Sequence, residues 1–178
     1  MNARAGCALA LASALAACAD PAASAVDATV DATPYQVSLA ALRPDGYEVL
    51  AGDAGIEMRL GFQGFRYARV LLVATGTVPA ASPGVFHFAI EGFDPAEQRV
   101  NAVAFHERNP GVFVSEPEMV FANDVALERV VGHVGTLTVT LDDRAHHAVG
   151  TYAGVLRWDP TCVEGADGVC LARDGGTP

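Results

Sequence analysis

Hydrophobic and polar side chains alternate along several short segments of the chain. Phe86, Phe88 and Ile90 are separated by smaller or more polar residues, and residues 136–141 alternate threonine with leucine or valine. A period of two residues is typical of a strand that buries one face and exposes the other. The pattern therefore predicts two half-buried strands.

Three further segments have the composition of strands. Residues 67–74 (YARVLLVA) are almost continuously apolar, which indicates a strand in the middle of a sheet. Residues 99–106 place Val103 and Phe105 on one face, and residues 147–158 form the last long run. We expect each of these segments to contribute one strand.

Turn-forming residues separate these runs at short intervals. They include Asp45-Gly46, Ser82-Pro83-Gly84, Asp94-Pro95, Asn109-Pro110-Gly111 and Asp142-Asp143. Short strands with frequent turn signals favour an antiparallel sandwich or barrel. The exception is residues 124–134, where apolar residues recur at helical spacing after Asn123-Asp124, a pair that could cap a helix. A single helical turn is expected there, with a loop plus strand as the alternative.

The first 17 residues have the three parts of a secretory signal. Arg4 lies in a short n-region, an apolar run follows, and small residues precede Cys18. The apolar run is shorter than the roughly 20 residues that a permanent membrane helix needs. These residues are therefore expected to direct export.

The string Leu15-Ala16-Ala17-Cys18 resembles the lipobox of bacterial lipoproteins at all four positions. The resemblance implies that Cys18 receives a diacylglyceryl group on sulfur, that the signal is cut just before it, and that its new amino group takes an acyl chain such as palmitate. A thiol suits this role because its thiolate is the attacking nucleophile. Several lipid chains would hold the protein stably on a membrane, whereas one would not.

Other processing remains an alternative, since Ala23-Ser24-Ala25 could also be cut and Cys18 then lost. In the lipoprotein family an aspartate directly after the cysteine favours the inner membrane. Ala19 holds that place here, which implies the outer membrane and the periplasm or cell exterior for the folded part. Residues 18–36 are rich in alanine and small polar residues, so we interpret them as the lipidated cysteine and a flexible tether.

The lipoprotein resemblance also bears on the remaining cysteines. With Cys7 removed in the signal and Cys18 lipidated, Cys162 and Cys170 remain as a natural disulfide pair in an oxidising compartment. Their loop would stabilise the fold by about 2.5 kcal/mol in the chain-entropy model. A two-cysteine metal site is the alternative, but no Cys-x-x-Cys spacing is present.

The segment from Gly132 to Trp158 resembles the last two strands of bacterial immunoglobulin-like domains. In both, a threonine- and valine-rich strand turns at an aspartate-rich corner and returns as a final strand. The resemblance implies an all-β, antiparallel immunoglobulin-like sandwich of about seven to eight strands. We expect it to occupy residues 37–159, followed by a disulfide loop and tail at 160–178.

The charge composition excludes several functions. The formal net charge is −10 at pH 7, which makes the chain a poor binder of nucleic acid. Arginine supplies every basic side chain, so P-loop and Schiff-base lysine chemistry is excluded. Serines Ser38, Ser82 and Ser115 all lie outside a Gly-x-Ser-x-Gly motif. No cofactor and no catalytic residue is expected.

Two groups of residues are candidates for binding. The histidines could hold a transition metal if the fold brought them together. Acidic loops could hold calcium, either at Asp142-Asp143 or around the predicted disulfide at Asp159, Glu164 and Asp167. The aromatic string around 61–67 could instead bind a partner protein or glycan, or it could anchor the core at a bulge. The histidine candidates are His87, His106, His146 and His147, and the string offers Phe62, Phe65, Arg66 and Tyr67.

The function expected from these observations is a membrane-anchored lipoprotein that presents a non-catalytic binding or structural module at the cell envelope. The alternative is a metal-dependent periplasmic enzyme or metal carrier that uses the histidines or the acidic loops. A protein or glycan of the envelope is the expected partner.

Overall fold

The structure is a computed structural model that describes residues 35–61, 64–122, 125–143, 145–160, 162–164 and 170–172. Within these residues the chain is all-β apart from one helical turn, as predicted. No helix in the described part is long and apolar enough to cross a membrane. The lipobox, the signal and most of the tether lie outside the described residues.

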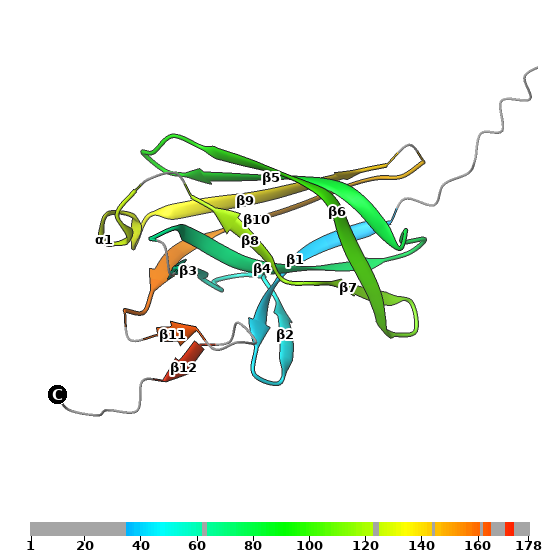
Figure 1. Cartoon of the computed structure of the whole chain (residues 1–178), viewed down its shortest axis with the longest axis horizontal. Coiled ribbons are helices and arrows are strands. Elements are labelled where there is room, and N and C mark those ends of the chain that lie inside the picture. The colour runs from blue at the N-terminus through cyan, green and yellow to red at the C-terminus, as the bar shows by residue number, and fades with distance from the viewer. Residues whose placement is uncertain are drawn as a thin grey trace, which may run out of the picture.

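The elements follow one another along the chain with short connections (Figure 1). Their bounds are β1 Gln36–Arg43, β2 Gly46–Val49, β3 Ile56–Leu60, β4 Arg66–Thr75, β5 Ala81–Ile90, β6 Ala96–Asn109, β7 Val112–Ser115, β8 Glu118–Phe121, α1 Leu127–Val130, β9 Val134–Asp142, β10 His147–Trp158, β11 Cys162–Glu164 and β12 Cys170–Ala172. The predicted last strand at 147–158 coincides with β10.

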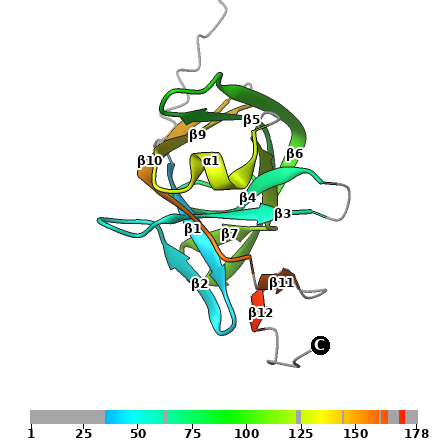
Figure 2. The same ribbon diagram turned by 90° about the vertical axis from the view of Figure 1, so that its left-hand side faces the viewer.

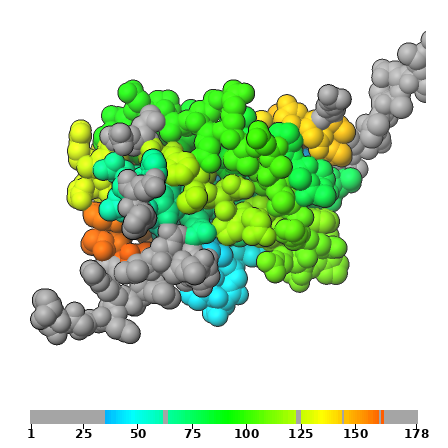
Figure 3. All heavy atoms as spheres, in the orientation of Figure 1, coloured from blue at the N-terminus to red at the C-terminus, as the bar shows by residue number. Residues whose placement is uncertain are grey.

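The main sheet closes into a seven-stranded barrel, so the predicted immunoglobulin-like sandwich is wrong. Following the hydrogen-bonded neighbours leads from β4 through β3, β10, β9, β5, β6 and β7 back to β4. Strands β1, β2 and β8 extend this ring from β4 and β1. Viewed end-on, the strands surround a common centre (Figure 2). In the space-filling view the β1–β2 hairpin projects below the barrel (Figure 3).

Strand β4 is the branch point of this closure. Its first half pairs with β3 on one side and β8 on the other, and its second half pairs with β1 and β7. Val70 and Leu72 face the core, while Tyr67 and Leu71 on the opposite face are also buried. Burial on both faces explains the continuous apolar run that predicted a central strand.

A parallel contact between β3 and β10 completes the ring. Ile56 lies opposite Leu156 and Met58 lies opposite Trp158, while the neighbouring strand pairs of the ring are antiparallel. Alternating burial is the same in a sandwich and in a closed barrel, because each buries one face of every strand. The sequence pattern therefore could not distinguish the two architectures.

The core follows the predicted alternation. Phe86, Phe88 and Ile90 of β5 are buried together with Val103 and Phe105 of β6. Leu137, Val139 and Leu141 of β9 are buried as well, and the intervening threonines are half-buried on the outer face. These strand predictions are confirmed, and the three strands place large side chains such as Phe86, Phe88 and Leu137 in the barrel interior.

The Ser82-Pro83-Gly84 segment is a strand and not the predicted turn. It lies within β5, and the pairing with β6 shifts register between Ser82 and Gly84. Proline cannot donate a ladder hydrogen bond, so an irregularity in the strand accommodates it. The turn-forming residues Ser82, Pro83 and Gly84 therefore mark a bulge in β5 rather than a turn.

The expected helical turn is present as α1, which lies across one end of the barrel (Figure 2). Leu127 and Val130 are buried in the core. The cap differs from the prediction, because Ala126 is the N-cap residue and makes no side-chain capping bond. Asn123 and Asp124 lie outside the described residues.

Strand β10 passes very close to β1 at a glycine. A Cβ atom added to Gly150 would lie 2.9 Å from the carbonyl oxygen of Val37 and 2.9 Å from its Cγ1. Two residues further on, the Tyr152 hydroxyl donates to the carbonyl of Ala54 and, at 3.3 Å, to that of Gly52. Gly150 and Tyr152 thus hold β10 against the N-terminal strands.

Replacing Gly150 by alanine is expected to destabilise the barrel by about 1–3 kcal/mol, because the new methyl group meets backbone that cannot move aside. Urea unfolding of the purified chain measures this change. Ala153→Val adds volume to an exposed position of the same strand and should change the unfolding free energy by less than about 0.5 kcal/mol. Equal stability of Gly150→Ala and the wild type would contradict the close approach.

Candidate functional site

A cavity of about 340 Å³ lies at the parallel junction of β3 and β10. The residues that line it come from the two strands and from the segment that follows β10. They are Glu57, Met58, Arg59, Arg157, Trp158, Asp159 and Cys162. The cavity therefore combines two guanidinium groups, two carboxylates, a thioether and an indole.

The strand register explains this mixture of side chains. Glu57 lies opposite Arg157, and Met58 lies opposite Trp158. Because successive residues of a strand point to opposite faces, the charged pair and the apolar pair lie on different sides of the junction. The cavity forms where the strands end, so both kinds of side chain reach it.

Arg59 is the most enclosed charge in the cavity, with a side chain that is 8% exposed. Its Nη2 atom lies 3.5 Å from Oε2 of Glu57, and its Nη1 atom donates to the sulfur of Cys162 at 3.8 Å. The 3.5 Å ion pair is long compared with a usual charge-assisted hydrogen bond of about 2.7–2.9 Å, and sulfur is a weak acceptor. The guanidinium is therefore buried with weak partners among the described residues.

Glu57 is shared between Arg59 and a second arginine. Nη1 of Arg43 lies 2.7 Å from Oε1 of Glu57, and Nε of Arg43 lies 2.9 Å from Glu48. Burial alone would lower the pKa of Arg43, but hydrogen bonds with Glu57 and Glu48 outweigh it and raise that pKa. Arg43 therefore keeps its charge and holds the better share of the Glu57 carboxylate.

Trp158 supplies the aromatic wall of the cavity and is the single tryptophan of the chain. It is partly buried and packs against the barrel core. Arg157 at the same junction donates to the carbonyl of Asp53 at 3.3 Å. The indole of Trp158 and the guanidinium groups of Arg59 and Arg157 therefore line the same cavity.

The aromatic string of the sequence does not form one exposed surface among the described residues. Tyr67 is buried, Arg66 is half-buried and Phe65 is exposed, whereas Phe62 lies outside the described residues. The Phe65 and Tyr67 rings each meet the ring of Phe121 edge-on, with centroids 5.7 Å and 6.1 Å apart. Phe121, which the sequence analysis did not single out, joins the two and favours an anchoring role for Tyr67.

The four candidate histidines are spread over the barrel. His87 lies on β5 opposite Thr138, and Nε2 of His106 on β6 lies 3.4 Å from Oε1 of Glu116. His146 and His147 lie at the β9–β10 turn. Among the described residues no group of three or more histidine, cysteine, aspartate or glutamate side chains is placed to hold a metal ion.

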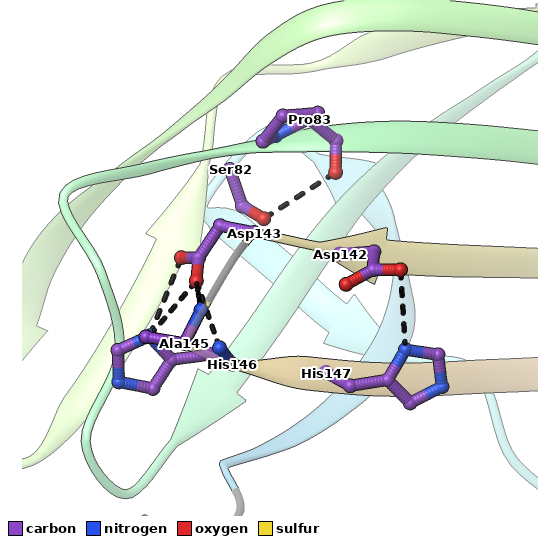
Figure 4. Close-up of polar contacts among 7 residues, drawn as sticks. All are labelled: Ser82, Pro83, Asp142, Asp143, Ala145, His146 and His147. Atoms are coloured by element: carbon purple, nitrogen blue, oxygen red, sulfur yellow. Dashed lines mark hydrogen bonds and ion pairs between the residues drawn. The ribbon is translucent and has the colours of Figure 1, made fainter. Parts of the chain in front are cut away.

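His146 and His147 each face a different aspartate (Figure 4). Oδ1 of Asp143 accepts hydrogen bonds from the backbone N–H groups of Ala145 and His146, both at 2.8 Å, and contacts Nδ1 of His146 at 3.1 Å. Nδ1 of His147 lies 3.9 Å from Asp142. The hydrogen bond from Ala145 above all lowers the pKa of Asp143, so this carboxylate closes the turn.

Two of the three candidate serines, Ser82 and Ser115, have structural partners. Ser115 is buried, where its hydroxyl accepts from the backbone N–H of Leu72 at 2.9 Å and donates to the carbonyl of Glu116 at 2.7 Å. Ser82 is also buried and donates to the carbonyl of Pro83 at 3.3 Å (Figure 4). These contacts join strands and support the bulge in β5.

The acidic and cysteine candidates near the C-terminus are described in part. Strands β11 and β12 pair antiparallel, with Cys162 opposite Ala172 and Glu164 opposite Cys170. The Cys170 and Glu164 side chains and the whole of Asp167 lie outside the described residues. The Cys162–Cys170 bridge therefore stays a prediction.

Glu118 on β8 has a raised pKa because it is partly buried and because Glu116 is nearby. A carboxyl with a raised folded-state pKa favours folding below its unfolded pKa, and this contribution is lost as the pH rises through the folded value. Glu118→Gln should therefore raise the melting temperature at neutral pH, and the gain should vanish near pH 4. Thermal unfolding of the variant and the wild type at neutral pH and near pH 4 measures this gain in melting temperature.

Glu91→Gln, which changes an exposed glutamate, is the matched control and should have little effect at either pH. A Glu118→Gln variant that gains no stability at neutral pH would contradict the burial of this carboxylate.

Arg59 and Trp158 were not predicted from the sequence to form a site. The two residues are about 100 positions apart, and only the parallel pairing of β3 with β10 brings them together.

A comparison with protein-family models, with curated proteins and with solved structures found no match to this chain.

Proposed function

We propose that this protein is a lipid-anchored protein of the cell envelope, that Cys18 carries the lipid, and that the barrel is a non-catalytic binding module. The observation that carries the proposal is the string Leu15-Ala16-Ala17-Cys18 after a secretory n-region and apolar run. The lipid anchors the chain, residues 18–36 serve as its tether, and a Cys162–Cys170 disulfide closes the C-terminal loop. The outer membrane is the location that Ala19 favours.

The cavity at Arg59 and Trp158 supports the binding role. A hollow of about 340 Å³ with an aromatic wall and a buried charge has the size and composition of small-molecule sites in proteins. Ser82, Ser115 and His146, by contrast, are engaged in turn and strand contacts. The site is thus suited to holding a molecule rather than transforming it.

The tether and the cavity lie at opposite ends of β10, which supports a binding module that faces away from its anchor. Tyr35, where the described chain begins, packs its ring against His146 with centroids 6.2 Å apart, just before β10 starts. Trp158 and the cavity lie at the other end of the strand, about 40 Å away for 12 residues. The two ends of β10 lie at opposite ends of the barrel (Figure 1). A tether that joins the barrel near His146 would therefore leave the cavity facing away from the membrane.

Washing of isolated envelopes tests the anchor. A lipid anchor is held by the hydrophobic effect, whereas a peripheral protein is held mostly by charges that about 1 M salt screens. We expect the protein to stay in the membrane fraction after high-salt and alkaline carbonate washes and to be released by a non-ionic detergent. Release by salt or carbonate alone would overturn the proposal.

A further inference from the structure

We infer that the cavity between β3 and β10 binds a small monocarboxylate with a flat apolar body. This inference rests on the proposed function only in treating the barrel as a binding module. It assigns the class of ligand to Arg59 and Trp158, which no sequence motif marks.

The buried guanidinium of Arg59 calls for an anionic partner. A guanidinium has five N–H donors, and among the described residues the contacts of Arg59 are a 3.5 Å ion pair with Glu57 and a 3.8 Å bond to sulfur. Glu57 is held more closely by Arg43, at 2.7 Å. A ligand carboxylate can accept two parallel N–H bonds from one guanidinium, and such charge-assisted bonds are the strong ones.

The apolar half of the ligand follows from the other wall. Met58 and Trp158 lie opposite each other in the register and both line the cavity. An indole face prefers a flat apolar partner, and a thioether adapts to the shape of its neighbour. A ring or short hydrocarbon that carries a carboxylate would thus contact Trp158 while its charge reaches Arg59.

The lining carries no net formal charge, so it does not favour a ligand with more than one negative charge. Two arginines, Arg59 and Arg157, are offset by two acids, Glu57 and Asp159. A doubly charged phosphate would have to approach both carboxylates, and like charges at close range are unfavourable. A monocarboxylate carries a single negative charge. The guanidinium of Arg59 can pair with that charge because its ion pair with Glu57 is long, at 3.5 Å.

Trp158 fluorescence tests this assignment without any mutation, because the chain has no other tryptophan. The purified mature protein in a non-ionic detergent is titrated with benzoate, with its uncharged analogue benzamide and with inorganic phosphate. We expect a saturable change with benzoate and affinity at least tenfold weaker for the other two, as loss of a charged hydrogen bond predicts. N-acetyltryptophanamide serves as the baseline for non-specific quenching.

Arg59→Gln should weaken benzoate binding at least tenfold, while Arg99→Gln, at an exposed arginine paired with Glu97, should leave it unchanged. Thermal unfolding establishes whether Arg59→Gln is folded; if it is not, the benzoate and benzamide titrations of the wild type decide. No saturable response to benzoate, or equal affinity for benzamide or phosphate, overturns the inference. The envelope washes test the anchor separately, so the two can fail independently.

Discussion

Replacing Cys18 by alanine is expected to abolish lipid labelling and to leave the unprocessed precursor. The thiolate of Cys18 is the proposed acceptor of the diacylglyceryl group, and alanine offers no nucleophile. In the lipoprotein family the signal is cut only next to the modified cysteine, so the signal should remain attached. Cells fed an alkyne-tagged fatty acid allow both effects to be measured, by the label in the protein band and by the mass of that band.

Cys7→Ala is the matched control, because it removes a thiol from the apolar run of the same signal. We expect this variant to be labelled and processed like the wild type. Normal labelling of Cys18→Ala, or loss of labelling in both variants, would contradict the assignment of Cys18 as the lipidated residue.

Phe88→Ala is expected to cost about 3–5 kcal/mol of stability, which is a large share of the 5–15 kcal/mol of an ordinary domain. Phe88 is 1% exposed and lies on β5 between Ala96 of β6 and Leu137 of β9. Its ring also lies 3.0 Å from the place where a Cβ atom of Gly135 would be. Removing the ring leaves a cavity that these closely packed strands cannot fill. Urea unfolding measures the loss.

Phe65→Ala makes the same chemical change at a side chain that is 55% exposed. It removes one edge-on ring contact with Phe121, so a loss of no more than about 1.5 kcal/mol is expected. If the two variants lose the same stability, the burial pattern of β5 is wrong.

The strands of the barrel could be predicted where one face is buried. Phe86 and Phe88 in β5, and the threonine alternation in β9, have the period of two that any half-buried strand requires. Closure could not be predicted, because it depends on β3 pairing parallel with β10 across about 100 residues. Gly150 marks a close approach of strands, but a glycine in a strand does not say which strand approaches.

The candidate site was predictable only in part. The sequence singled out residues by chemical type, such as the adjacent His146 and His147, and the structure assigns these to a turn with Asp143 and Asp142. In β3, Ile56 and Met58 face the core, so the alternation of the strand predicts that Arg59 faces outward. Arg59 is nevertheless buried and contacts Cys162 beyond the end of β10, which no local pattern indicates.

The N-terminal mass of the mature protein tests the central claim most directly. The protein is extracted from envelopes with detergent and digested, and its first peptide is measured by mass spectrometry. The lipid anchor predicts a peptide that begins at Cys18 and carries a diacylglyceryl group and an acyl chain. An unmodified peptide that begins at Val26, after cleavage behind Ala25, would contradict the lipid anchor.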